Sequence, residues 1–418
     1  MQNEGLFSFE NMIESFDFTV FDPDISMKWD ESQQFMPELD CLRPEEIRKQ
    51  AEIVGLTETE LNALLGAAVE IKQHHGLARL FRHSLFHLID GTVMPKLKKW
   101  PTEIPPLETR SGLFYLLLAM ALVPRIHSWH QSLGLPEKIT RDTCQQIQSF
   151  CNNYRRGHNG LLGVYVNQLS WLSIYPRERY FRLGGFEYRL KMFNSEMQVW
   201  RHNSTGQVVA LAKNGSQFTN DGYIAYADYQ EKWTSRITQT NQSVTGFPIS
   251  PYGTANSKEV TLLFSEWQQV LKSTDIILDM HIPQGGGMTP AACKESHRLA
   301  FEFFKQYFPA EEFKAIVCHS WLFNTQLEEI LPPESNLVQY MRNLYLFPVP
   351  SNGQDGLWFI FLQEPLDLST APCETSLQRS VLDFLKKGSR WRSGGMFLLR
   401  ENILKFGTQH YRSNWKIP

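Results

Sequence analysis

The sequence predicts an α+β protein, in which a helical N-terminal domain precedes a mixed β-sheet flanked by helices. Apolar residues keep helical spacing from about residue 43 to residue 153. The composition becomes polar and glycine-rich at residues 154–165, and strand-like patterns follow. Within this second part, residues 275–304 have the pattern of a strand, a glycine turn and a helix. We therefore expect two domains, residues 1–155 and 156–418.

The composition argues against a nucleic-acid-binding, secreted or membrane-spanning protein. The 418 residues carry a formal net charge of −3, so we expect no nucleic-acid partner. The six cysteines form no C-x-x-C pair, which favours reduced thiols and a cytoplasmic location. The acidic, aromatic N-terminus lacks the pattern of a signal peptide. The longest apolar run, residues 113–123, is about half of the roughly 20 residues that span a bilayer, so we expect a core helix and no membrane span.

The N-terminal domain is predicted element by element. Residues 1–40 mix aromatic and acidic side chains with little periodicity, which indicates an irregular arm packed on the body by its aromatics. Pro44 opens a helix, and Thr57 with Glu60 forms a capping box for the next one. Further helices are expected at residues 113–123 and 140–153.

Histidines at steps of four raise the question of a metal site. His75, Arg79, His83 and His87 fall at steps of four on one helix, but no glutamate lies between the histidines as in a zinc protease and no third ligand is evident. We expect a polar seam between helices here and at His127 and His130, and no metal.

The second domain is predicted to contain the sheet. Strands at residues 180–190, 197–201 and 208–212 should form an antiparallel meander. A strand at 259–264 and a short helix at 265–271 follow. A strand at 314–322 should run parallel to the one before the glycine turn, because a helix separates the two. The remaining elements expected are helices at 325–330, 337–342 and 376–387 and strands at 357–362 and 396–399.

The strand, turn and helix at residues 275–304 carry the strongest functional signal. Asp279 and His281 alternate with apolar residues near the strand's end, and Pro283 ends the strand. The glycines at 285–287 let the backbone approach a ligand, and Thr289 is a natural N-cap, so the unpaired N–H groups of the helix start form an anion site. The patterns of a P-loop and of a dinucleotide-binding turn are both absent. A plain glycine-rich turn is the structural alternative.

Five segments in the same order resemble a family of two-domain bacterial acyltransferases. They are residues 281–293, 317–323, 331–336, 377–383 and 388–395. This family joins an N-acyltransferase N-terminal domain to a C-terminal domain similar to the GNAT superfamily, whose mixed sheet is splayed at its centre. The resemblance implies transfer of an acyl group from a thioester donor, acyl-coenzyme A, to an amine-bearing acceptor.

The resemblance also implies a donor-binding turn. It consists of Gln284, Gly285, Gly286, Gly287, Met288 and Thr289. Gln284 stands where the common GNAT turn opens with a basic residue, so an acyl-carrier protein remains an alternative donor.

The chemistry of acyl transfer selects the candidate catalytic residues. His281 is the leading general base, because an amine must lose a proton during attack. Asp279 could orient His281 or bind the amine, or could be structural. His319 or Ser320 could supply a proton to the departing thiolate. Cys318 as a nucleophile is less favoured than Cys318 as a core residue. A non-catalytic module that binds the acyl donor, or serves only in interactions, is the rival interpretation.

Overall fold

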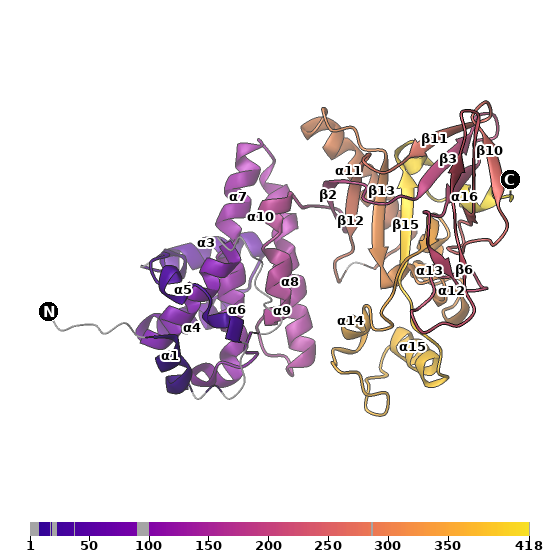
Figure 1. The fold of residues 1–418 in the computed structure, drawn as a ribbon. Coiled ribbons are helices and arrows are strands. Elements are labelled where there is room, and N and C mark those ends of the chain that lie inside the picture. The colour runs from indigo at the N-terminus through magenta and orange to yellow at the C-terminus, as the bar shows by residue number, and fades with distance from the viewer. Residues whose placement is uncertain are drawn as a thin grey trace. The chain divides into compact units, whose positions relative to one another are not determined.

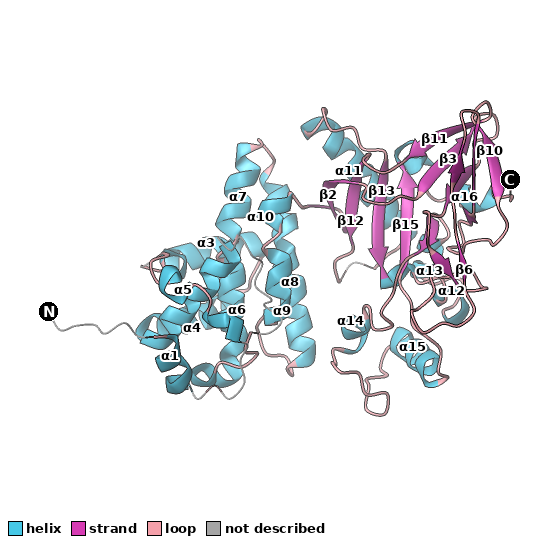
Figure 2. Ribbon diagram, in the orientation of Figure 1, coloured by secondary structure: helices cyan, strands magenta, loops and turns pink. Residues whose placement is uncertain are grey.

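The computed structural model describes residues 8–16, 18, 23–36, 38–89, 100–285 and 287–417, without the side chains of Pro23 and Glu178. The chain divides into two compact units, Met1–Arg182 with Pro283–Gly285, and Leu183–Ile282 with Gly286–Pro418. The first is helical and the second contains the main sheet (Figures 1 and 2).

The first unit extends beyond the boundary expected at residue 155. Helix α8 (Glu137–Gly157) continues through that position, and α9 (Val166–Leu172) and α10 (Tyr175–Glu178) follow it. Apolar side chains from both of these short helices belong to the same buried cluster as the preceding helices. The composition changes near residue 155, but the packing of the helical unit continues for a further two helices.

Several α- and 3₁₀-helices precede α8, and those that the sequence predicts from Pro44 onward are among them. They are α1 (Phe9–Phe16), η1 (Pro23–Ser26), α2 (Trp29–Ser32), η2 (Asp40–Leu42), α3 (Pro44–Val54), α4 (Glu58–Gln73), α5 (His75–Ile89), η4 (Pro105–Arg110), α6 (Ser111–Met120) and α7 (Val123–Ser132). The capping box is confirmed, because Thr57 and Glu60 bond reciprocally at the start of α4. Every residue of α6 is buried, which explains why its sequence is apolar on all sides.

One stretch of this unit resembles a membrane span by composition. Within the described part of the chain, Pro105–Ser132 is long and apolar enough to cross a membrane by length and composition alone. Its most apolar window is 78% buried inside the structure. The core helices of soluble proteins share this combination of properties.

The N-terminal arm is helical where it was expected to be irregular. Phe9, Phe16 and Trp29 are nonetheless buried, as the aromatic content predicted, and the rings of Phe9 and Trp29 meet edge to face at 5.3 Å. Phe7 and Phe21 lie outside the described residues.

Two histidines of α5 form hydrogen bonds with backbone oxygens of the arm. His83 Nε2 lies 2.5 Å from Ile25 O, and His87 Nε2 lies 3.0 Å from Met27 O.

The histidines of α5 and α7 do not gather into a larger cluster of metal-ligating side chains among the described residues. No group of three or more histidine, cysteine, aspartate or glutamate side chains lies close enough together there to hold an ion. The ring of His130 is likewise engaged within the helical unit, where its Nδ1 lies 2.9 Å from Thr140 Oγ1.

The second unit is built on a six-stranded sheet of order β1-β2-β12-β13-β15-β14. These strands are β1 (Phe181–Leu183), β2 (Phe186–Met192), β12 (Ile276–His281), β13 (Ala315–Ser320), β15 (Gly394–Leu399) and β14 (Tyr345–Pro348). Strands β12 and β13 are parallel, as predicted, and α11 (Pro290–Tyr307) connects them through the short segment at residues 308–314. Strand β2 is antiparallel to β12, and β15 is antiparallel to both β13 and β14.

Several smaller strands pack beside this sheet. They are β3 (Gln198–His202), β4 (Val208–Leu211), β5 (Gln217–Phe218), β6 (Trp233–Thr234), β7 (Thr238–Gln239), β8 (Ser243–Gly246), β9 (Pro248–Ile249), β10 (Val260–Leu263) and β11 (Trp267–Leu271). The predicted meander is wrong, because β2 pairs with β12 whereas β3 and β4 belong to a separate sheet of order β11-β3-β4-β9.

Two predictions of secondary structure are wrong, and both concern short segments. Strand β11 was expected to be a helix, and α14 (Leu357–Phe361) was expected to be a strand. Both are five-residue segments, too short for periodicity to separate the two states. Pairing with β3 decides the first, and left-handed backbone at Gly356 and Leu362 bounds the second. The helix predicted at residues 376–387 is present as α15 (Ser376–Lys386).

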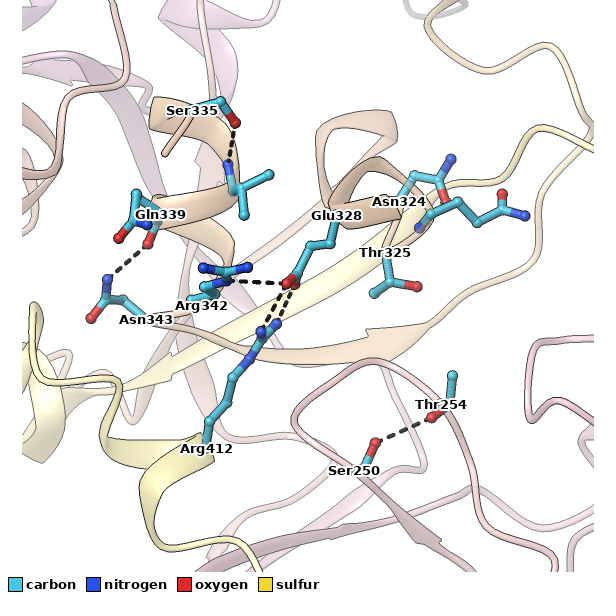
Figure 3. Close-up of polar contacts among 12 residues, drawn as sticks. Ser250, Thr254, Asn324, Thr325, Glu328, Ser335, Gln339, Arg342, Asn343 and Arg412 are labelled. Atoms are coloured by element: carbon cyan, nitrogen blue, oxygen red, sulfur yellow. Dashed lines mark hydrogen bonds and ion pairs between the residues drawn. The ribbon is translucent and has the colours of Figure 1, made fainter. Parts of the chain in front are cut away.

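The C-terminus is held by an arginine pair around one carboxylate (Figure 3). Glu328, in α12 (Leu327–Ile330), accepts from Arg342 Nε at 3.3 Å and from Arg412 NH1 at 3.0 Å. Arg342 directly follows α13 (Asn336–Met341), and Arg412 lies in α16 (His410–Ser413). The cluster therefore links three short helices.

A buried polar network fixes α11 on one face of the main sheet. His297 of α11 is fully buried, with Nδ1 3.0 Å from Tyr188 Oη and Nε2 3.1 Å from Tyr340 Oη. Burial lowers the pKa of His297 to about 3, so the ring is neutral in the folded protein. Burial also holds the pKa values of Tyr188 and Tyr340 well above their usual range.

The network predicts an acid-sensitive second unit. An unfolded histidine has a pKa of about 6.5, so below that pH the unfolded chain binds a proton that folded His297 excludes, and stability falls as the pH drops toward 3. Between pH 7 and pH 5, the loss from His297 should be about 2 kcal/mol. Urea unfolding of wild type and His297→Gln at both pH values measures this difference. An identical pH dependence in the two proteins would contradict the assignment.

Candidate functional site

The main sheet opens between its two parallel strands. The ladder from β12 to β13 runs from Ile277 paired with Ala315 to Asp279 paired with Val317, and then ends. The ladder from β12 to β2 continues to the last residue of the strand, where His281 pairs with Glu187. The end of β12 therefore stays with β2 and separates from β13. This is the central splay expected of the fold.

His281 and Glu187 form a hydrogen-bonded pair at the splayed end. Nδ1 of His281 lies 2.7 Å from Oε2 of Glu187. The carboxylate side chain is 0% exposed, whereas the imidazole is 29% exposed. A carboxylate accepts from the protonated ring nitrogen, so we assign the proton to Nδ1, which leaves the lone pair on Nε2. The pair thus presents one basic nitrogen beside the opening.

Asp279 lies on the same face of β12 but has other partners. Its Oδ2 accepts from Arg189 Nε at 2.8 Å and from Arg189 NH2 at 2.7 Å, and Lys191 Nζ lies 3.6 Å from it. The hydrogen-bond partner of His281 is Glu187, so the orienting contact that the sequence suggested for Asp279 is made by a different carboxylate. Three charged residues of β2 therefore line this face of the sheet.

The candidates on β13 lie on opposite faces of that strand. His319 shares the face of Asp279, because Val317 pairs with Asp279 and His319 follows two residues later. Its side chain is exposed, and desolvation by surrounding protein lowers its pKa, an effect that Asp279 partly opposes. Ser320 lies on the other face, where its Oγ accepts from Leu322 N at 3.2 Å. Cys318 is buried, and desolvation raises its thiol pKa well above the usual value.

The glycine turn has the features that the sequence predicts at its ends. Gly285 has a φ of 105°, which favours glycine. Thr289 caps α11 by accepting from Ala292 N at 3.3 Å, and Pro290 is the first helical residue. Gly286 lies outside the described residues. Pro283–Gly285 belongs to the helical unit, within which Ser149 Oγ donates to Gln284 O at 3.3 Å.

Sequence reasoning missed the residues of β2. Glu187, Arg189 and Lys191 alternate with Phe186, Tyr188 and Leu190, so the strand has one polar and one apolar face. That alternation was available in the sequence. The sequence did not show which residues this polar face would meet, because the predicted meander placed the strand beside residues 197–201. In the structure it lies beside β12, which carries His281.

Comparison with known proteins identifies both parts of the chain. The model of the N-acyltransferase N-terminal domain matches residues 45–175, and the model of the GNAT-like C-terminal domain matches residues 180–398. No curated protein matches the chain.

Solved acyltransferases share the fold. An acyltransferase mutant in complex with octanoyl-CoA is 19% identical, with a TM-score of 0.60, and the match covers 93% of this chain and 98% of that one. An acyltransferase in complex with decanoyl-CoA and teicoplanin gives 20% identity, a TM-score of 0.60 and the same coverage. A complex with CoA and 10C-teicoplanin gives the same values. The GNAT-like match alone spans more than half of the sequence, so this chain belongs to the family of proteins with a GNAT-like C-terminal domain.

Proposed function

We propose that the protein transfers an acyl group from acyl-coenzyme A to a primary amine by direct attack of the amine on the thioester. The observation that carries the proposal is the pair of Glu187 and His281 at the splayed end of β12. The pair lies immediately before a glycine turn and a helix N-terminus. Base and anion site are thus adjacent in one continuous segment. The acyl-CoA complexes of the similar acyltransferases support this class of donor, and their teicoplanin complexes support an amine-bearing acceptor.

The pair of side chains supplies the proton transfer. The amine nitrogen attacks the thioester carbonyl carbon, and Nε2 of His281 takes the amine proton as the C–N bond forms. Buried Glu187 stabilises the imidazolium that results, because the two charges meet away from water. The C–S bond then breaks and the thiolate of coenzyme A leaves. A lowered pKa keeps His319 neutral at pH 7, so its ring N–H can donate a hydrogen bond to that thiolate.

The turn supplies the donor site. Residues Gln284 to Thr289 would hold the pyrophosphate of coenzyme A on backbone N–H groups at the start of α11, where the helix dipole also favours an anion. Backbone N–H groups at the end of β12, beyond its ladder with β13, would stabilise the oxyanion that forms during attack. Asp279 has the charge to bind the amine cation, although Arg189 and Lys191 already offset it.

Direct attack is favoured over a covalent acyl-enzyme. The only cysteine at the centre of the sheet among the described strands, Cys318, is buried on the face opposite to His319. Its raised pKa leaves little thiolate at neutral pH, and the thiolate is the nucleophilic form.

His281→Ala should lower kcat by at least about a hundredfold at neutral pH, because a placed base contributes roughly 10²- to 10⁴-fold. The loss should shrink at high pH, where the amine deprotonates unaided. Steady-state assays with acyl-CoA across pH measure both effects, with His202→Ala on β3 as the matched histidine control. A folded His281→Ala protein with wild-type activity would show that His281 is not the base.

Donor binding without turnover in the wild type would favour the non-catalytic module.

Gly285→Ala should raise the KM for acyl-CoA roughly tenfold with little change in kcat, because a side chain at a φ of 105° strains the phosphate-binding turn. Gly206→Ala is the matched control, since Gly206 also has a positive φ, of 71°, and an added Cβ at either glycine meets no atom within 4 Å. The KM comparison separates phosphate binding from general backbone strain. Equal KM values in both variants and wild type would argue against donor binding at this turn.

A further inference from the structure

Arg392 is a buried cation without a paired acid. The residue is 8% exposed, and its NH1 donates to Ile224 O at 2.9 Å. The guanidinium carbon lies 4.7 Å from the ring centre of Tyr223 and 4.9 Å from that of Tyr226. Across the described residues, no aspartate or glutamate forms an ion pair with Arg392. Buried charges are usually paired, because removing them from water is costly.

Arg390, two residues earlier, shows the usual arrangement. It stacks on Tyr226 at 5.0 Å, and its NH1 donates to Asp228 Oδ1 at 2.7 Å. NH2 of Arg390 also donates to Asp228 Oδ2, so the pair is bidentate. The same loop therefore carries one arginine on the surface with a carboxylate partner and one buried arginine without.

The neighbours of Arg392 are themselves fixed by hydrogen bonds. Tyr226 Oη donates to Trp391 O at 2.6 Å, and Trp391 Nε1 donates to Asp355 O at 2.8 Å. Desolvation lowers the pKa of Arg392, while the tyrosine hydroxyls nearby oppose this effect. A guanidinium held in this way is preorganised for an oxyanion, since its forked N–H donors match two oxygens of a carboxylate or a phosphate.

The position of Arg392 connects it to the candidate active site. Two residues later, Gly394 opens β15 opposite Ser320, and Gly395 lies opposite His319. Adjacent strands are about 4.8 Å apart. Arg392 therefore lies at the end of the sheet to which His319 belongs, on the far side of β13 from the turn that begins α11.

We propose that Arg392 binds an oxyanion group, a carboxylate or a phosphate, carried by one of the two substrates. The identification of the ligand as a substrate rests on the proposed acyl transfer, whereas anion binding itself does not. The acceptor is the source that the position favours, because β13 separates Arg392 from the turn assigned to the donor's pyrophosphate. An acceptor of this kind would carry an acidic group in addition to its amine.

Anion binding is tested first, without turnover. Thermal unfolding of the full chain is followed with increasing acetate at constant ionic strength, because inorganic phosphate would also bind at the turn assigned to the donor's pyrophosphate. Wild type should be stabilised saturably, and Arg392→Gln should lose the response or need at least tenfold more anion. Arg390→Gln is the matched control and should keep the wild-type response. If Arg392→Gln does not fold, Arg392→Lys keeps the charge, loses the forked donors and should respond more weakly than wild type.

Two further measurements identify the source of the anion. Titration with coenzyme A should give equal affinities for wild type and Arg392→Gln if the acceptor carries the oxyanion, and a selective loss of at least tenfold in Arg392→Gln if the donor does. A matched pair of acceptors, an amine with a free carboxylate and the corresponding carboxamide, is then compared. If the acceptor carries the oxyanion, wild type should prefer the carboxylate over the carboxamide; if the donor carries it, wild type should not distinguish them. The absence of a saturable anion response in wild type, or an equal response in Arg392→Gln, would overturn the proposal whether or not acyl transfer is found.

Discussion

The structure of the candidate site depends on where one ladder of hydrogen bonds ends. Strand β12 keeps its pairing with β2 to its last residue but loses its pairing with β13 after Asp279. The divergence leaves the end of β12 next to an opening in the sheet, with His281 at its edge. Because His281 still pairs with Glu187, its side chain is held while the sheet opens beside it. Rigid placement and access to a substrate therefore come from the two edges of a single strand.

Charge on the open face is organised by the same register. The direct pairs across β2 and β12 are Glu187 with His281 and Arg189 with Asp279, so each carboxylate meets a side chain that can donate an N–H group. A buried carboxylate needs such a partner, because burying an unpaired charge is costly. The opposite face carries the neutral network around His297, which holds α11 and hence the start of that helix. The two faces thus support the proposed base and the proposed anion site separately.

The sequence predicted the long and regular parts of this arrangement. The helices with clear caps, the parallel relation of β12 and β13, and the strand and helix on either side of the glycine turn are all present. Long-range pairing could not be predicted in the same way. The polar alternation of β2 does not show which strand lies beside it. The sequence therefore does not identify Glu187 as the partner of His281, and it suggests Asp279 for that role. Short apolar segments such as β11 and α14 failed because their state is fixed by neighbours rather than by their own pattern.

The central claim is that Glu187 and His281 act as one unit. A double-mutant cycle of Glu187→Gln and His281→Ala on kcat/KM for acyl-CoA tests this directly, with circular dichroism to verify folding. If Glu187 acts through the imidazole, the double variant should be no slower than His281→Ala alone, because the carboxylate has nothing left to orient. Losses that multiply in the double variant would contradict the account and would assign the two residues independent roles.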